Sequence, residues 1–167
     1  VVVSAMSGET NRLINLAKSF GDNPDRREFD ALISTGEKVS ASLLAMALNS
    51  IGVKAKSFSA SQISMKTTGH HSKAKIIDVN VDKILATLND DIVPIITGFQ
   101  GVTESGDVTT LGRGGSDTTA VAIAAHVNAT RCDIYTDVDG IYTTDPRVVP
   151  EAKKLDSITM EEMLEMA

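Results

Sequence analysis

Residues 92–101 read IVPIITGFQG, a run of apolar residues that passes directly into a polar segment containing two glycines. An unbroken apolar run is typical of a strand buried on both faces, as strands of parallel sheets are. Pro94 removes one donor from the ladder, but the run otherwise reads as a buried strand. In open α/β sheets, ligands bind beyond the carboxyl ends of the strands, so the glycine segment is a candidate binding loop.

The same alternation of strand, loop and helix extends along the chain in both directions. Strands are predicted near residues 1–4, 53–58, 75–79, 92–96 and 134–136, and helices around 13–17, 27–51, 81–88 and 117–127. Gly36 interrupts the longest helical region and predicts a bend or a close approach. Strands that alternate with helices predict an α/β fold in which helices cover both faces of a mainly parallel sheet.

Composition and charge narrow the classes of function. The 167 residues suit one globular domain, and the net charge of −6 with scattered basic residues argues against a nucleic-acid partner. No uninterrupted apolar stretch approaches the roughly 18 residues that cross a bilayer, and no signal peptide is apparent, so we expect a cytoplasmic protein without a membrane partner. Cys132, the sole cysteine, is predicted to be a reduced core residue. The three histidines lack ligand-like spacing, so no metal site is predicted.

Three loops could carry chemistry. The first, Ser4–Thr10, joins a strand to a helix, where free N–H groups and the helix dipole favour an anion. Many strand–helix turns contain Ser and Gly for purely structural reasons, so this loop is weak support alone.

The second loop reads TLGRGGSD at residues 110–117 and precedes a predicted helix. Ser116 and Asp117 could simply cap that helix. Capping does not explain an arginine flanked by glycines, whereas a guanidinium with a closely approaching backbone suits a carboxylate or phosphate. We therefore favour a binding role for Arg113.

The third loop reads TDVDGIYTTDPR at residues 136–147. Its Asp-Gly and Pro residues are typical of a surface turn. Tyr142 and Arg147 are unusual in a plain turn, and together they could hold an adenine edge and a phosphate. The P-loop pattern and the complete G-x-G-x-x-G pattern are both absent, which disfavours those two nucleotide-binding classes.

Four segments, in this order, resemble the aspartate kinases of the amino-acid kinase family: SAMSG at 4–8, STGE at 34–37, TLGRGGSD at 110–117 and TDVDGIYTTDPR at 136–147. The last two are very specific, the first is only suggestive, and the resemblance covers essentially the whole chain. It implies a three-layer αβα sandwich and transfer of the γ-phosphoryl group of ATP to the β-carboxylate of L-aspartate, with Mg²⁺ held mainly through the phosphates. The product would be 4-phospho-L-aspartate, on the way to lysine, threonine and methionine.

The resemblance also implies roles for individual residues. Glu37 would pair with the substrate ammonium and Arg113 with its α-carboxylate, and Asp117 would be a catalytic residue that positions lysines. The remaining substrate-binding residues would be Thr10, Gly114, Gly115 and Ser116. The ATP-binding residues would be Ser4, Gly8, Thr136, Asp137, Tyr142, Thr143, Thr144, Asp145, Pro146 and Arg147.

The sequence departs from the family at both ends. A Lys-Phe-Gly-Gly strand and a later Gly-Ala-Lys-Val-Leu-His segment, each with a lysine near the phosphates, are absent, as are regulatory ACT domains. We therefore expect residues 1–167 to be an incomplete catalytic domain, weak or inactive alone, from an oligomeric parent. The alternatives are another amino-acid kinase, acting on glutamate, acetylglutamate or UMP, and a non-catalytic fragment.

Overall fold

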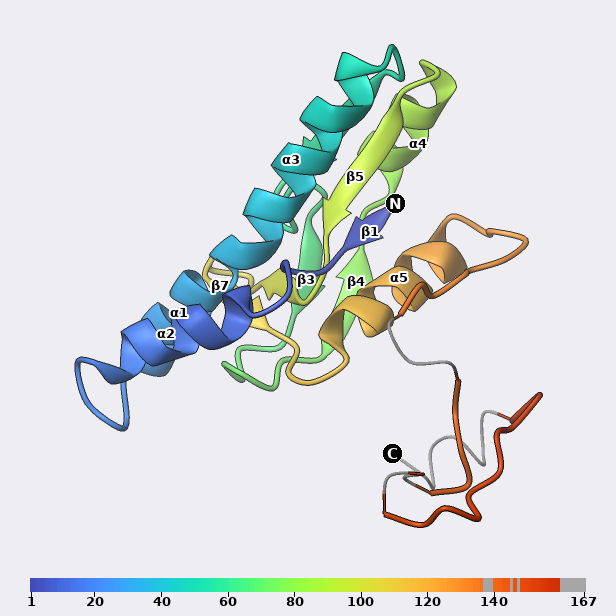
Figure 1. Ribbon diagram of the computed structural model, residues 1–167. Helices are drawn as coiled ribbons and strands as arrows, with labels where there is room; N and C mark the ends of the chain where they lie inside the picture. Colours follow the sequence, from blue (N-terminus) through green and yellow to red (C-terminus); the bar gives the residue numbers. More distant parts are fainter. Residues whose placement is uncertain (137–139, 145, 147, 160–167) are drawn as a thin grey trace. The chain divides into compact units, whose positions relative to one another are not determined.

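The structure is a computed structural model that describes residues 1–136, 140–144, 146 and 148–159. The chain divides into two compact units, Val1–Cys132 and Asp133–Ala167. The first unit carries all the helices and strands in the described part of the chain (Figure 1).

A three-stranded parallel sheet forms the centre of the first unit. Its strand order is β1 (Val2–Val3), β5 (Val93–Thr97), β2 (Ala55–Phe58). Strand β5 is almost wholly buried, as its continuous apolar run predicts. The carboxyl ends of the three parallel strands therefore meet at one edge of the sheet.

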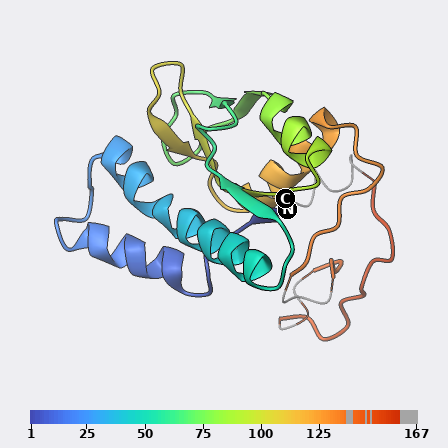
Figure 2. The same cartoon turned by 90° about the horizontal axis from the view of Figure 1, so that it is seen from above.

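Helices cover both faces of this sheet, which confirms the predicted αβα layering (Figure 2). Successive residues of a strand point to opposite faces, so Ile95 and Ile96 of β5 join different cores. Ile95 packs with Ala41 and Ala45 of α3 (Thr35–Ser50). Ile96 belongs to the core on the other face, together with residues of α4 (Asp82–Asn89) and α5 (Gly115–His126).

Two further helices, α1 (Glu9–Lys18) and α2 (Arg26–Ile33), pack against each other and lead into α3. The helical region predicted at 27–51 is therefore two helices, and the break falls at Ser34 rather than at Gly36. The buried side chain of Gln100 donates from Nε2 to the carbonyl of Ser34 at 2.9 Å, which holds this junction against the sheet.

The segment Arg26–Ser50 is long and apolar enough, by length and composition alone, to cross a membrane. It includes the junction between α2 and α3, and α3 buries Ala41 and Ala45 against the sheet. Core helices of globular domains often have the same composition, so this segment is weak support for a membrane span.

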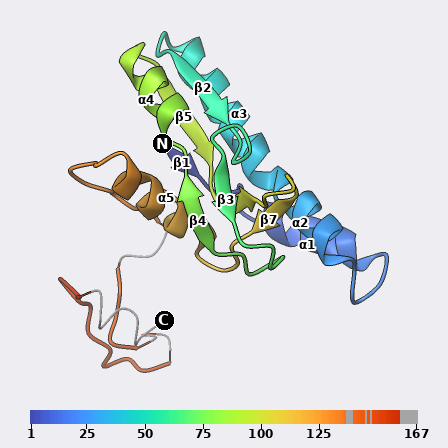
Figure 3. The ribbon, with the colours of Figure 1, turned by 180° about the vertical axis from the view of Figure 1, so that it is seen from behind.

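The first unit also contains a second sheet, which is mixed and lies beside the parallel sheet (Figure 3). Its order is β4 (Ile76–Val79), β3 (Met65–Thr67), β6 (Gln100–Val102), β7 (Val108–Thr110), and only the β3–β6 pair is parallel. The sequence predicted β4 but not the other three strands. Each of those is three residues long, too short to show a two-residue period.

The second unit, and Cys132 just before it, depart from two expectations. Residues 134–136 form no strand, and the side chains of Ile134 and Tyr135 are exposed, because these residues make no β-ladder with a neighbour. Cys132, expected in the core, is also exposed. Within this unit, Tyr142 forms an isolated antiparallel bridge with Lys154.

Gly101 shows how tightly the second sheet is packed. An added Cβ there would collide with Cγ2 of Thr67 and lie 3.1 Å from the carbonyl oxygen of Met65. We predict that Gly101→Ala lowers the free energy of unfolding by about 1–3 kcal/mol, the usual range for an overpacked core. Urea denaturation would measure the loss.

The matched control is Gly69→Ala, since an added Cβ at Gly69 would lie 4.0 Å from its nearest neighbour, Cγ2 of Thr103. We expect this control to unfold close to the wild type. Equal stabilities for the two variants would show that the close β3–β6 approach does not limit packing.

Candidate active site

A cavity of about 270 Å³ lies within the first unit, next to the carboxyl end of β1. It brings together parts of the chain more than a hundred residues apart: the loop after β1, the first turns of three helices, the turn after β5 and the glycine loop. Its lining residues are Ser4, Ala5, Thr10, Glu37, Phe99, Gly112, Arg113, Gly114, Gly115, Ser116 and Asp117. All six predicted substrate-binding residues, Asp117 and Ser4 are therefore neighbours of one space.

Glu37 is the buried charge of this cavity. It lies in the first turn of α3 with only 3% of its surface exposed. Its Oε1 accepts a hydrogen bond from the backbone N–H of Ala5 at 3.1 Å, while its buried Oε2 has no partner among the residues that the structure describes. Burial raises the pKa of Glu37 to about 7, although hydrogen bonds from the backbone N–H groups of Glu37 and Ala5 act in the opposite direction. A carboxylate with an unsatisfied oxygen in a cavity is suited to receive a cation.

Gly36 allows Glu37 to reach this position. An added Cβ at Gly36 would lie only 2.8 Å from the Cβ of Ala5. The absence of a side chain therefore lets the start of α3 pack directly on the loop after β1. The close approach predicted at Gly36 is present, although the helix break is at Ser34.

Glycines shape the loop that carries Arg113. Gly112 and Gly114 have φ angles of +86° and +68°, which residues other than glycine rarely adopt. An added Cβ at Gly115 would lie 2.8 Å from Cδ2 of Phe99, so the start of α5 packs directly on the turn after β5. These glycines have backbone roles that a simple flexible loop would not require.

Arg113 projects from this loop with its side chain exposed, and it has no ion pair or hydrogen bond with any residue in the described part of the chain. Ser116 and Asp117 lie in the first turn of α5, where backbone N–H groups lack intrahelical partners and the helix dipole is positive. The first turn of α1 contributes Thr10 in the same way. Apart from the two carboxylates, the cavity therefore favours an anion.

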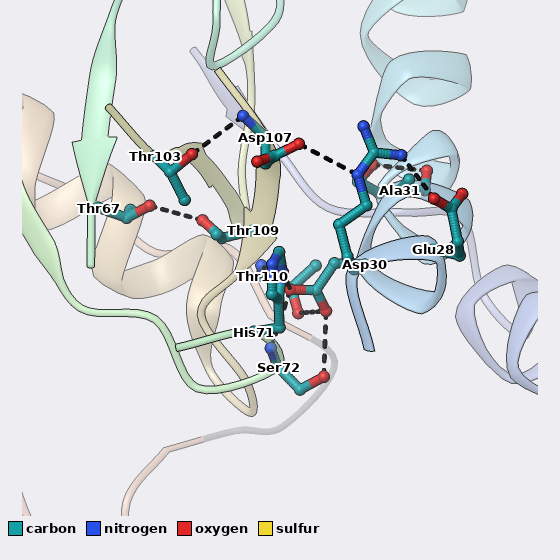
Figure 4. A network of polar contacts seen from close by, with 12 residues as sticks. Glu28, Asp30, Ala31, Thr67, His71, Ser72, Thr103, Asp107, Thr109 and Thr110 are labelled. Atoms are coloured by element: carbon teal, nitrogen blue, oxygen red, sulfur yellow. Dashed lines mark hydrogen bonds and ion pairs between the residues drawn. The ribbon is translucent and has the colours of Figure 1, made fainter. Parts of the chain in front are cut away.

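Asp30, which no sequence pattern predicted to be important, holds the glycine loop at 110–117 in place. Asp30 of α2 is fully buried and accepts five hydrogen bonds (Figure 4). Thr110 donates from its N–H at 3.0 Å and from its hydroxyl at 2.8 Å, Ser72 donates from N–H at 2.9 Å and from its hydroxyl at 3.1 Å, and His71 Nδ1 lies at 3.0 Å. An acidic residue in an amphipathic helix gives no sequence signal for such a role, because its partners lie 41 to 80 positions away.

The network around Asp30 continues to the cavity. Thr110 is the last residue of β7 and the first of the glycine loop. An added Cβ at Gly112 would lie 3.3 Å from the carbonyl oxygen of Ser72, so the 71–73 turn supports the loop from behind. Asp30 thus fixes both the strand before Arg113 and the turn beneath it.

The predicted ATP-binding residues are divided between the two units. Ser4 lines the cavity, and Gly8 begins α1 with a φ of +77° without lining the cavity. Thr136, Tyr142, Thr143, Thr144 and Pro146 belong to the second unit, in which the N–H of Thr143 donates to the carbonyl of Lys153 at 2.9 Å. Asp137, Asp145 and Arg147 lie outside the described residues.

No group of three His, Cys, Asp or Glu side chains converges on a possible metal position among the residues that the structure describes.

An α/β sandwich with glycine loops and helix N-termini around a small polar cavity is an arrangement suited to small charged ligands. The whole chain, residues 1–167, matches the model of the amino acid kinase family, and the chain belongs to that family.

Several proteins that this chain resembles are aspartate kinases. An aspartate kinase of Pseudomonas putida is 58% identical over 167 residues, covering 100% of this chain and 41% of that protein. The crystal structure of Escherichia coli aspartokinase III in complex with aspartate and ADP has a TM-score of 0.80 and 38% identity, covering 94% of this chain and 36% of that one. An aspartate kinase structure from Synechocystis has a TM-score of 0.77 and 46% identity, covering 99% of this chain and 27% of that one. The chain thus spans well under half the length of these relatives.

The Asp30 network should contribute strongly to stability. We predict that Asp30→Asn lowers the free energy of unfolding by about 3 kcal/mol, because an amide cannot accept from all five donors and leaves buried groups without partners. Thermal or urea denaturation would measure the loss. Asp107→Asn is the control: Asp107 pairs with Arg27 at 3.1 Å on the surface, where solvent screens the interaction, so its loss should be much smaller. Comparable losses would contradict the role assigned to Asp30.

The raised pKa of Glu37 predicts a pH-dependent stability. Below about pH 4.5 the carboxyl is protonated in both states, but between about 4.5 and 7 the unfolded chain loses the proton first. The free energy of unfolding should therefore fall across this window relative to Glu37→Gln and become level above about pH 7. Urea titrations of both proteins at several pH values would measure the difference. The pH dependence of the unfolding free energy of Glu104→Gln, a change at an exposed position, should run parallel to that of the wild type. A wild-type curve that runs parallel to the curve of Glu37→Gln would contradict the raised pKa of Glu37.

Proposed function

We propose that this chain is an incomplete catalytic domain of an aspartate kinase. It would transfer the γ-phosphoryl group of ATP to the β-carboxylate of L-aspartate and give 4-phospho-L-aspartate for the synthesis of lysine, threonine and methionine. The observation that carries the proposal is that one cavity of about 270 Å³ is lined both by Glu37, whose Oε2 has no hydrogen-bond partner among the described residues, and by Arg113, whose guanidinium has no partner among those residues either.

This pair of charges matches the two ends of an amino acid. The ammonium group would satisfy Oε2 of Glu37, and the α-carboxylate would bind the planar fork of Arg113. A buried polar site rejects ligands that leave its groups unpaired, so the pairing also disfavours UMP and acetylglutamate, which lack a free ammonium group. Glutamate keeps both groups, and its extra methylene is the feature that the cavity would need to reject.

The chemical step needs little from the protein beyond positioning and positive charge. The ionised β-carboxylate of aspartate attacks the γ-phosphorus, a new C–O–P linkage forms, and the bond to the β-phosphate oxygen breaks to leave ADP. A carboxylate is already ionised at neutral pH, so no general base is required. N–H groups in the first turn of α5 would help to stabilise the charge on the transferring group.

The residues that would contact ATP by resemblance to the family are Ser4 and Gly8 in the first unit and the 136–147 segment in the second. The relative from E. coli was solved with ADP and aspartate, which supports a nucleotide and an amino acid in this family. Mg²⁺, when bound, would neutralise the phosphates, and the nucleotide itself would supply most of its ligands. Asp117 would orient lysines that lie outside this chain, so residues 1–167 alone would be weakly active or inactive.

The cellular location of the complete protein follows from the proposed aspartate kinase activity. An enzyme of amino-acid synthesis that uses ATP belongs in the cytoplasm, and we propose that the complete protein works there as an oligomer. The net charge of −6 offers no extended basic surface for nucleic acid.

Calorimetric titration of the chain tests the substrate. We predict that Arg113→Ala weakens L-aspartate binding at least about tenfold, the effect of losing one good charged contact, and leaves ATP–Mg²⁺ binding within about twofold. Arg27→Ala is the matched control, since Arg27 is bound to Glu28 and Asp107 on the surface, away from the cavity residues.

In the complete protein, a hydroxylamine trap for acyl phosphates would identify the acceptor, with aspartate expected to exceed glutamate. Preference for glutamate, acetylglutamate or UMP would overturn the proposal in favour of another amino-acid kinase. Failure of the chain to bind either aspartate or ATP–Mg²⁺, with no activity in the complete protein, would leave a non-catalytic role.

A further inference from the structure

A second cavity, of about 450 Å³, lies in the first unit and shares no lining residue with the first. It lies where β2 and β5, neighbouring parallel strands, end at Phe58 and Thr97. The opposite wall is the start of α3, through Lys38 and Ser42. Carboxyl ends of parallel strands are where open α/β sheets bind ligands.

Four polar side chains around this cavity have no partner in the described part of the chain. The hydroxyl of Thr97 is the most telling, because Thr97 is only 1% exposed and its Oγ1 makes no hydrogen bond. The hydroxyl of half-buried Ser57 makes no hydrogen bond within the described residues either, whereas the hydroxyl of Ser42 and the ammonium group of Lys38 are exposed to solvent and are free to bind a ligand. Buried polar groups are normally satisfied, so a buried hydroxyl without a partner at a cavity wall is a donor that a ligand in the cavity could satisfy.

The charge of the cavity indicates the kind of ligand. Lys38 is its single charged lining residue, and no Asp or Glu faces it. Lys38 lies in the first turn of α3, where the helix dipole adds to the positive potential. One ammonium with several hydroxyl donors suits a group that bears a negative charge on more than one oxygen.

Neighbouring residues of the chain line the two different cavities. Glu37 and Lys38 are consecutive residues of α3, yet one lines the first cavity and the other lines the second. In the same way Thr97 and Phe99 lie on either side of Gly98 and line different cavities. A ligand in the second cavity would therefore not need to occupy the amino-acid site.

We propose that the second cavity binds a small oxyanion, the phosphate or carboxylate group of a metabolite, between Lys38 and the hydroxyls of Ser42, Ser57 and Thr97. The oxyanion accepts hydrogen bonds from these groups and satisfies the buried oxygen of Thr97. The site is independent of the aspartate kinase activity proposed above.

Amide NMR spectra of the ¹⁵N-labelled chain test this site. Inorganic phosphate and succinate would be titrated separately, as the phosphate and the carboxylate probe. We expect at least one probe to shift the signals of Ser57, Ser59 and Lys38 with saturation. The probe that binds identifies the group, and the same shifts should persist in Arg113→Ala, which removes the cation of the first cavity.

Two variants separate a binding role from a structural one. Lys38→Met keeps the aliphatic stem and should weaken binding at least about tenfold, whereas Lys54→Met, at an exposed lysine outside both cavities, should not change it. Thr97→Val removes an unpartnered buried hydroxyl, so it should weaken binding about threefold or more and yet raise the Tm of the free protein by roughly 2–4 °C.

The proposal is overturned if neither probe shifts the signals of residues 57–61, or if all shifts fall on residues 112–117 of the first cavity. It is equally overturned if Lys38→Met and Thr97→Val bind as tightly as the wild type. A lower Tm for Thr97→Val would show that the hydroxyl has a structural partner, and would remove the observation on which the site depends.

Discussion

The carboxylate of Glu37 is buried, with one oxygen bonded to the N–H of Ala5 and the other without a partner in the described part of the chain, and the rest of the site is arranged around it. Burial disfavours its ionised form, which is why its pKa is raised to about 7. A folded chain tolerates such a group only where the surroundings hold it in place or a ligand satisfies it. Gly36 brings it against the loop after β1, and Glu37 lines the cavity.

The two buried carboxylates of the first unit illustrate the difference between a structural and a binding group. Asp30 accepts five hydrogen bonds and has no capacity left for a ligand. Glu37 accepts one from another residue and keeps an oxygen free. The first fixes the strand and turn that support the Arg113 loop, and the second faces the space that this loop encloses. Stability and binding are thus assigned to different acidic residues.

Local chemistry made part of this arrangement predictable. The apolar run of β5 predicted a buried parallel strand, and the glycines around Arg113 predicted close backbone approach. Glu37 itself was placed in the site by family resemblance, since a single glutamate in a helix carries no such signal. The short strands β3, β6 and β7, the break at Ser34 and the Asp30 network were not predictable, because each depends on partners distant in sequence. The expected strand at 134–136 was wrong for the same reason: a β-branched run forms a strand only where a neighbour pairs with it.

Titration of the Glu37 side chain tests the central claim most directly. With ¹³C-labelled glutamate, the carboxyl signal of Glu37, assigned by its loss in Glu37→Gln, reports the pKa in the free chain and in the chain saturated with L-aspartate. We expect a pKa near 7 without ligand and a fall towards the ordinary value of about 4.5 when an ammonium group pairs with Oε2. A pKa that saturating aspartate leaves unchanged would show that the substrate ammonium binds elsewhere.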